Sequence, residues 1–187
     1  MLGFGMKISL FLLPLLLVPG GCEKQPDVEP PAKVARYVPP AGALNGVRGP
    51  GGEVDLREDL YYRKGAQDPY SGILYALYEN GNARYQLTVK EGKPDGVSVE
   101  WHDNGQKQQE THYVEGVLNG PILTWHKNGK KASEGGYKDG KPDGRFEGWH
   151  ENGKKSGEGN FKDGKSSDRK FWNSKGEPVD TFEETKK

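Results

Sequence analysis

The sequence has few of the residues that cross-link or fill a compact domain. Cys22 is the single cysteine among 187 residues, so no disulfide can form within one chain. Only 32% of the residues are hydrophobic, too few for a thick core between two layers. After the apolar N-terminal segment, no stretch carries apolar residues at the helical period, so no layer of helices is expected.

An excess of charge of one sign is also missing. Lys and Arg number 27, and Asp and Glu number 27. The two signs are interleaved, so no basic stripe can follow a phosphate backbone, and we expect no nucleic acid among the partners. The pairs Lys130-Lys131 and Lys154-Lys155 are expected to be solvated turn residues, with a weak contact to an anionic surface as the alternative.

Residues 1–21 have the pattern of a secretory signal peptide. Lys7 supplies a short basic region, and an apolar run from Ile8 to Val18 follows it. The run is too short to cross a bilayer, because a spanning helix needs roughly 20 residues. A retained membrane helix is therefore the weaker interpretation.

Cys22 follows directly after the small residues Gly20 and Gly21. Its position resembles the lipobox of bacterial lipoproteins, although Pro19 stands where that pattern usually has an aliphatic residue. The resemblance implies cleavage before Cys22, a lipid thioether on its sulfur and acylation of the new N-terminus. Such lipidation would anchor the chain in the cell membrane or outer membrane of a bacterial envelope. Ordinary secretion with a free thiol at Cys22 is the alternative.

Residues 22–52 are expected to form a disordered tether rich in proline and glycine. Few large apolar side chains occur here, so burial cannot offset the entropy lost on ordering the chain. A semi-extended chain of this kind would hold the folded part away from the membrane. Its prolines are Pro26, Pro30, Pro31, Pro39, Pro40 and Pro50.

A fixed step of 24 residues organises the rest of the chain. Asn-Gly pairs recur at this step, and each of the last three follows a Trp-His pair, which marks a repeat architecture. We expect a repeat domain over residues 53–177, with atypical units at its ends, and a polar tail over 178–187. The Asn-Gly pairs are Asn80-Gly81, Asn104-Gly105, Asn128-Gly129 and Asn152-Gly153, and the Trp-His pairs begin at Trp101, Trp125 and Trp149.

Each Asn-Gly pair predicts a β-hairpin with a two-residue type I′ turn, which needs positive φ at both central residues. A second turn, such as Lys138 to Pro142, would lead into the next hairpin. The fold class is then all-β, an elongated antiparallel meander of 24-residue β-hairpin repeats after the signal peptide and the disordered linker. The register would pair Trp101 with Gln108, Val99 with Glu110 and Gly96 with Tyr113, whose ring would cover the glycine.

The unit from Asp143 to Lys165 resembles a MORN repeat. The likeness rests on Asp143-Gly144, on the run Trp149 to Lys154 and on the run Gly159 to Lys165. More closely, the unit looks like the bacterial MORN variant of YwqK-like proteins, which are named for the antitoxin component of a toxin–antitoxin module. The resemblance covers roughly Tyr61 to Gly176 and implies a repeat scaffold that serves many roles.

Two recurrent side chains invite a chemical role. Histidines in successive repeats would lie about 9.6 Å apart, too far to converge on one zinc ion, so a structural role beside each turn is expected. Recurrent glutamates would have equivalent environments and no cleft, unlike a glycosidase pair. We therefore expect no enzyme, no catalytic residue, no metal and no cofactor. The residues are His102, His126 and His150, and Glu110, Glu134 and Glu158.

A ladder of tryptophans is the best candidate binding surface, because large rigid aromatic side chains are typical binding anchors. The alternative is that they pack on one another as the core of a thin fold. The ladder comprises Trp101, Trp125, Trp149 and Trp172.

These features together favour a membrane-anchored envelope lipoprotein whose repeat sheet binds a protein or an envelope polymer without catalysis. The alternative, which the family resemblance alone suggests, is an antitoxin or immunity protein that neutralises a toxin.

Overall fold

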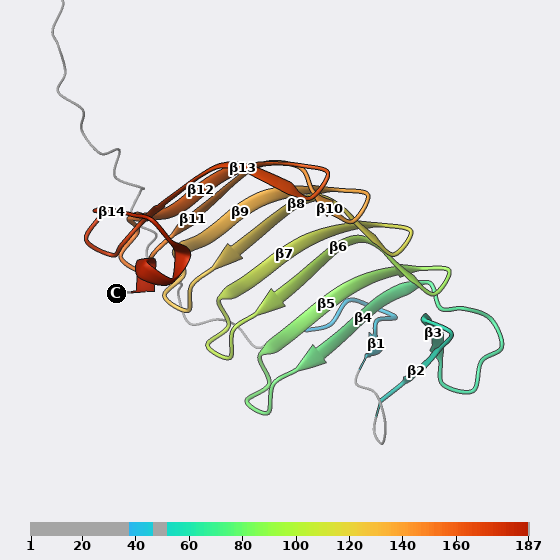
Figure 1. Cartoon of the computed structure of the whole chain (residues 1–187). Coiled ribbons are helices and arrows are strands. Elements are labelled where there is room, and N and C mark those ends of the chain that lie inside the picture. The colour runs from blue at the N-terminus through green and yellow to red at the C-terminus, as the bar shows by residue number, and fades with distance from the viewer. Residues whose placement is uncertain (1–37, 47–51, 187) are drawn as a thin grey trace, which may run out of the picture.

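The computed structural model describes residues 38–46 and 52–186, so the signal peptide, Cys22 and most of the expected tether lie outside the described residues. Twelve strands form one long sheet, and two more pair separately (Figure 1). The described segments contain no α-helix. Their one short 3-10 helix is not long and apolar enough to cross a membrane. The expected fold class, an elongated all-β meander of hairpin repeats, is confirmed.

The large sheet has the order β1-β4-β5-β6-β7-β8-β9-β11-β12-β13-β14, with β10 beside β9. Its strands are β1 (Leu44–Asn45), β4 (Gly72–Leu77), β5 (Ala83–Lys90), β6 (Lys93–Trp101), β7 (Lys107–Val114), β8 (Val117–Trp125), β9 (Lys131–Lys138), β10 (Lys141–Pro142), β11 (Gly144–Trp149), β12 (Lys155–Lys162), β13 (Lys165–Trp172) and β14 (Pro178–Val179). The small sheet joins β2 (Val54–Arg57) to β3 (Leu60–Arg63), and a 3-10 helix, η1, spans Phe182–Lys186.

The register within a hairpin agrees with the sequence except beside the turn. In the β6–β7 hairpin, Gly96 pairs with Tyr113 and Val99 with Glu110, as expected. Trp101, however, pairs with Lys107 rather than with Gln108, because the register shifts by one residue between Glu100 and Trp101. The same shift precedes Trp125 and Trp149, so each of these three tryptophans faces a Lys across its own hairpin.

The prediction of a type I′ turn at each Asn-Gly pair is wrong. Gly105 has a φ of 84°, but Asn104 is not among the residues with positive φ. Gly105 N donates to the His102 oxygen at 2.9 Å, and His102 N donates to the Gln106 oxygen at 2.8 Å. The loop therefore has three residues, a type I turn followed by a left-handed glycine, and this extra residue causes the register shift.

Type I′ turns occur instead at the opposite edge of the sheet. Glu91 and Gly92 have φ values of 49° and 79°, and Asp139 and Gly140 have values of 50° and 77°. Each of these turns joins one repeat to the next through two residues. Gly140 N also donates to the Leu118 oxygen of the preceding repeat at 2.9 Å, so neighbouring repeats are tied at this edge.

Glycines give room to neighbouring side chains. At Gly96, which pairs with Tyr113, an added Cβ would meet Thr88 at 3.5 Å. At Gly135 an added Cβ would lie 2.3 Å from the ring of Phe146. Phe146 in turn contacts Tyr137 and Phe161 edge-on, with centroid distances of 5.9 and 4.8 Å. A small aromatic cluster therefore stabilises this face of the C-terminal repeats.

Both ends of the array are covered by chain that does not follow the repeat. Within the segment expected as a tether, Leu44 is 5% exposed and pairs in parallel with Leu74 of β4. Val54 of β2 joins the same buried cluster. At the other end, within the segment expected as a polar tail, Phe182 of η1 packs on Phe171 at 6.1 Å.

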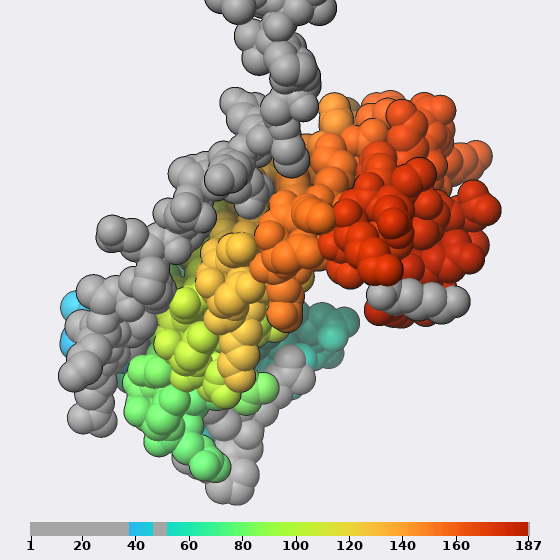
Figure 2. Space-filling model, turned by 90° about the vertical axis from the view of Figure 1, so that its left-hand side faces the viewer, coloured from blue at the N-terminus to red at the C-terminus, as the bar shows by residue number. Residues whose placement is uncertain are grey.

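The repeats follow one another along the molecule in sequence order. The side view shows consecutive bands from green through yellow and orange to red (Figure 2). Every antiparallel pairing in the large sheet joins a strand to the next strand along the chain, apart from short β10. Stability of this kind of array comes from each repeat and its contacts with its neighbours.

Candidate functional site: the tryptophan face

Trp and Lys alternate across one face of the sheet. The cross-strand pairs are Trp101 with Lys107, Trp125 with Lys131 and Trp149 with Lys155. We call this row, together with the adjacent row of glutamates Glu110, Glu134, Glu147 and Glu158, the tryptophan face. Its strands run from β6 to β12, so it extends over three repeats.

Two of these lysines also reach the tryptophan of the next repeat. Lys107 Nζ lies 5.1 Å from the ring centroid of Trp125, and Lys131 Nζ lies 5.4 Å from that of Trp149. Cation–π contacts at such distances contribute about 0.5–1 kcal/mol each at exposed sites. The lysines therefore separate successive indole rings, and the tryptophans do not stack on one another as a continuous core.

The glutamates neutralise these lysines. Lys107 Nζ lies 2.8 Å from Glu110 Oε2, and Lys131 makes the equivalent ion pair with Glu134. The recurrent carboxylates Glu110 and Glu134 are thus ion-paired.

A larger ion-pair network forms on the last repeat. Lys155 Nζ lies 2.6 Å from Glu147 and 2.9 Å from Glu158, and Arg145 bridges the same two carboxylates at 2.9 Å each. Hydrogen bonds from Lys155 lower the pKa of Glu147 and of Glu158. Partial burial opposes charge on Lys155, but bonds to both glutamates raise its pKa overall. The network is therefore held fully charged near neutral pH.

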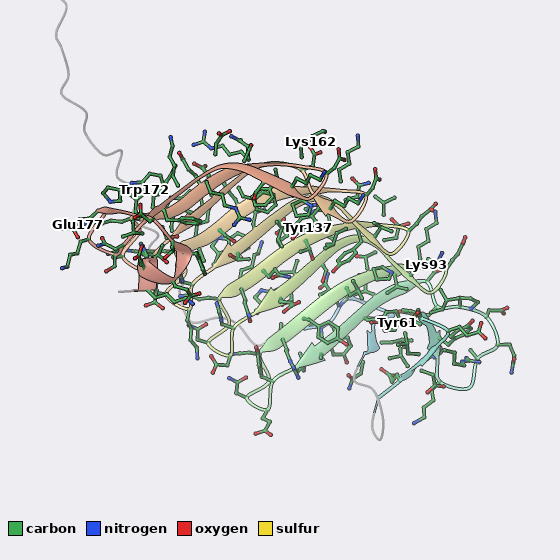
Figure 3. All side chains as sticks on the ribbon, viewed as in Figure 1. Tyr61, Lys93, Tyr137, Lys162, Trp172 and Glu177 are labelled. Atoms are coloured by element: carbon green, nitrogen blue, oxygen red, sulfur yellow. The ribbon has the colours of Figure 1, made fainter. Side chains whose placement is uncertain are left out.

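The four candidate tryptophans are all half-buried. Trp172 lies at the far end of the row in β13, where it pairs with Pro178, and Figure 3 places it at the opposite end of the array from Tyr61. The turn after it, from Asn173 to Glu177, repeats the hydrogen bonds of the Asn-Gly turns, but among the described residues Trp172 has no cation–π contact of the kind that Lys107 and Lys131 make. The repeating Trp–Lys geometry therefore covers Trp101, Trp125 and Trp149.

The histidines beside the Asn-Gly turns connect neighbouring repeats. Nε2 of each histidine lies 2.8–2.9 Å from the carbonyl oxygen of the tryptophan in the following repeat. A carbonyl oxygen can only accept, so Nε2 carries the proton and donates. Tyr78 holds the equivalent position in the first repeat, and its hydroxyl donates to the Trp101 oxygen at 2.8 Å. The three histidines are His102, His126 and His150.

The turn asparagines make a second set of connections. Asn128 Nδ2 donates to the Glu151 oxygen of the next repeat at 3.0 Å, while its Oδ1 accepts from Lys130 N at 3.0 Å. Asn104 and Asn152 bond in the same way. In the part of the chain that the structure describes, no three His, Cys, Asp or Glu side chains are grouped to hold a metal ion.

A groove of about 800 Å³ lies on the opposite face, near the first repeats. Tyr61, Tyr85 and Tyr113 line it, and Arg84 and Glu100 supply charge. Glu100 is the one carboxyl-bearing residue of its lining, so the groove offers no pair of convergent carboxylates. The sequence did not reveal this groove because Tyr61 and Gly46 come from segments outside the regular repeat.

The sequence interpretation missed the lysines of the tryptophan face. It treated Lys131 and Lys155 as turn residues, whereas on the sheet Lys131 lies between Trp125 and Trp149 and Lys155 pairs with Trp149. A signal was present, because Lys107, Lys131 and Lys155 share the 24-residue step and each has a glutamate three positions later.

Comparison with known proteins identifies the repeat unit. The family model described as "MORN repeat variant" matches three consecutive segments, residues 94–115, 118–139 and 142–163. Each match covers one hairpin with its Asn-Gly turn. Three consecutive segments of the chain thus match this repeat type, and MORN repeats generally act as binding or scaffold modules. No curated protein and no solved structure matches the chain.

Proposed function

We propose that the chain is a lipid-anchored protein of the bacterial envelope whose tryptophan face binds a protein or an envelope polymer without catalysis. The observation that carries this proposal is the Trp–Lys row, which continues over three repeats on one face of the sheet. Half-buried indole rings supply large contact areas at little entropic cost, as binding anchors do.

The architecture leaves this face accessible among the described residues. Strand β2 packs through Val54 onto the cluster that contains Leu74, on the other face of the sheet. Helix η1 packs through Phe182 onto Phe171. Phe171 pairs with Gly157, the neighbour of Glu158 in β12, and side chains alternate along a strand, so Phe171 points to the face opposite the glutamate row. Neither of these end segments therefore covers the tryptophans.

Anchoring rests on the N-terminal sequence. The apolar run ending at Val18 and the small residues before Cys22 support export and lipidation of that cysteine. The tether expected over residues 22–52 would hold the repeats clear of a membrane surface.

A catalytic role has little support. The first two units of the tryptophan face present the same ion-paired Lys and Glu, and in the last unit Glu147 and Glu158 are both paired with the same two cations, Lys155 and Arg145. Such a repeating surface suits binding along its length.

Fractionation of cells tests the anchor. We expect the natural chain in the membrane fraction and a Cys22→Ser variant in the soluble fraction, because the lipid attachment atom is lost. A Cys22→Ser variant that stays with the membrane would contradict the anchor.

Capture from envelope extracts tests the face. The full chain in detergent should retain a partner that a Trp125→Ala/Trp149→Ala variant loses, while Tyr62→Ala in β3 should behave like the natural chain. Equal capture by all three proteins, or none by any, would overturn the binding role. Capture of a toxin through this face would instead favour the antitoxin alternative.

A further inference from the structure

We propose that the tryptophan face binds an extended β-1,4-linked glycan and takes one disaccharide per repeat. This inference rests on the proposed function and names the class of polymer. It follows from the period of the row, from the chemistry of its side chains and from the balance of its charges.

The period of the row is set by the sheet. Trp101, Trp125 and Trp149 lie on alternate strands, β6, β8 and β11, with one strand between each pair. Two strand spacings amount to about 9.6 Å. An extended β-1,4-linked chain turns each sugar over relative to the last, so alternate rings present the same face at a closely similar spacing. Successive indole rings can therefore meet equivalent sugars.

The side chains suit the two kinds of surface on a sugar. The axial C–H groups of a β-linked ring form an apolar face that packs on an aromatic ring. Its equatorial hydroxyls both donate and accept hydrogen bonds. Between the indoles, Lys131 offers N–H donors and the paired Glu134 offers acceptor oxygens. Each repeat thus supplies one partly exposed indole ring with a donor and an acceptor beside it.

The charges favour a glycan with little charge of its own. Every lysine in the row is already ion-paired with a glutamate at 2.9 Å or less. A polyanion would have to displace these carboxylates and would meet repulsion from them. Hydroxyl groups can instead bond to the ion pairs as they stand.

The row predicts how affinity depends on glycan length. The first and third tryptophans lie about 19 Å apart, which is two disaccharide steps, so three tryptophans with one disaccharide each take six sugars. Each added disaccharide gains one more stacking contact without a new association cost, so affinity should rise at each step and level off after the third.

Titration calorimetry with the full chain in detergent tests this prediction. The probes are chitobiose, chitotetraose and chitohexaose, with maltohexaose as the α-linked control. We expect each added disaccharide to tighten binding roughly tenfold, and maltohexaose to bind at least that much more weakly than chitohexaose. Equal affinity for chitobiose and chitohexaose, or for the two hexasaccharides, would overturn the proposal.

Variants show whether the face is responsible. Trp125→Ala interrupts the row and should weaken chitohexaose binding roughly tenfold, whereas Trp125→Phe keeps a ring and should lose less. Tyr62→Ala removes an aromatic side chain outside the row and should change nothing. Melting curves of all three confirm that they fold. Unchanged chitohexaose binding by a folded Trp125→Ala would also overturn the proposal.

The capture experiment distinguishes failure of the glycan proposal from failure of the proposed binding function. If no chitooligosaccharide binds but a protein is still captured through Trp125 and Trp149, the glycan proposal is wrong and the binding role stands. If neither occurs, both are wrong.

Discussion

His126 Nε2 donates a hydrogen bond of 2.8 Å to the carbonyl oxygen of Trp149 in the next repeat. The same bond recurs from His102 and His150. Because that oxygen belongs to the tryptophan that pairs with Lys155, the bond fixes where the next indole ring leaves the backbone. The histidines thus help to set the spacing of the row that we propose as the binding site.

His126→Ala should destabilise the array by about 1 kcal/mol, because it leaves a half-buried carbonyl without its donor. His126→Gln, whose amide can donate, should lose less. Urea unfolding followed by tryptophan fluorescence measures both. The control is His112→Ala, since His112 lies on the sheet and makes only a 3.3 Å contact with the Pro121 oxygen. A loss from His112→Ala as large as that from His126→Ala would show that the inter-repeat bond is not the cause.

Asn128→Asp should also cost about 1 kcal/mol. The new carboxylate can still accept from Lys130 N, but it faces the Glu151 oxygen with an acceptor where Nδ2 donated. Asn160→Asp, at an exposed position in β12, adds the same charge without touching a turn. Thermal unfolding of the two variants at neutral pH makes the comparison, and equal melting temperatures would contradict the role of Nδ2.

Gly135→Ala should destabilise the fold by about 1–3 kcal/mol, because its Cβ would overlap the ring of Phe146. Gly157→Ala is the milder comparison, since its Cβ would lie 3.2 Å from Phe171. In a double-mutant cycle, Phe146→Leu should reduce the cost of Gly135→Ala. Additive losses in that cycle would mean that the ring is not what the alanine meets.

Acid should weaken the last repeat through Glu147 and Glu158. Lys155 lowers the pKa of both carboxyls below their ordinary value of 4.5 in the folded state. Their contribution to stability is therefore complete above about pH 4.5 and is lost as the pH falls through the lowered values. At alkaline pH the raised pKa of Lys155 has the corresponding effect: the stability that this lysine contributes is lost as the pH rises beyond 10.5.

The measurement is the melting temperature between pH 3 and pH 7 for the natural chain and for Lys155→Met. We expect Lys155→Met to be less stable at pH 7 and to lose less on acidification, because protonation relieves two carboxylates that have lost a partner. Lys165→Met, an exposed lysine of β13, should follow the natural chain. Parallel pH profiles for the natural chain and Lys155→Met would refute the linkage.

Much of the fold follows from the period of the sequence. The step between successive Asn-Gly pairs locates the hairpins, and alternation gives the register as far as Val99 and Glu110. The turn type did not follow, because Asn-Gly suits both a type I′ turn and a type I turn closed by a left-handed glycine. The longer loop brings Asn104 to the Lys127 oxygen of the next repeat, a contact that no local pattern encodes.

The candidate site was only half predictable. The tryptophan positions could be read from the repeat, but the place of Lys131 between two indole rings depends on the one-residue shift beside the turn. The end segments were not predictable from the repeat, since Leu44 and Phe182 belong to no unit and owe their places to the apolar surface that an open array leaves at its ends.

The asparagines that join the turns also expose the chain to chemical ageing. When glycine follows asparagine in a loose chain, the glycine nitrogen attacks the side-chain carbonyl and ammonia leaves, and hydrolysis of the resulting ring gives an acid. In the folded array both side-chain atoms of Asn128 are held by hydrogen bonds, which keeps the group away from that attack. A molecule that stays unfolded for long would therefore refold with acidic side chains at its turns and with fewer hydrogen bonds between its repeats.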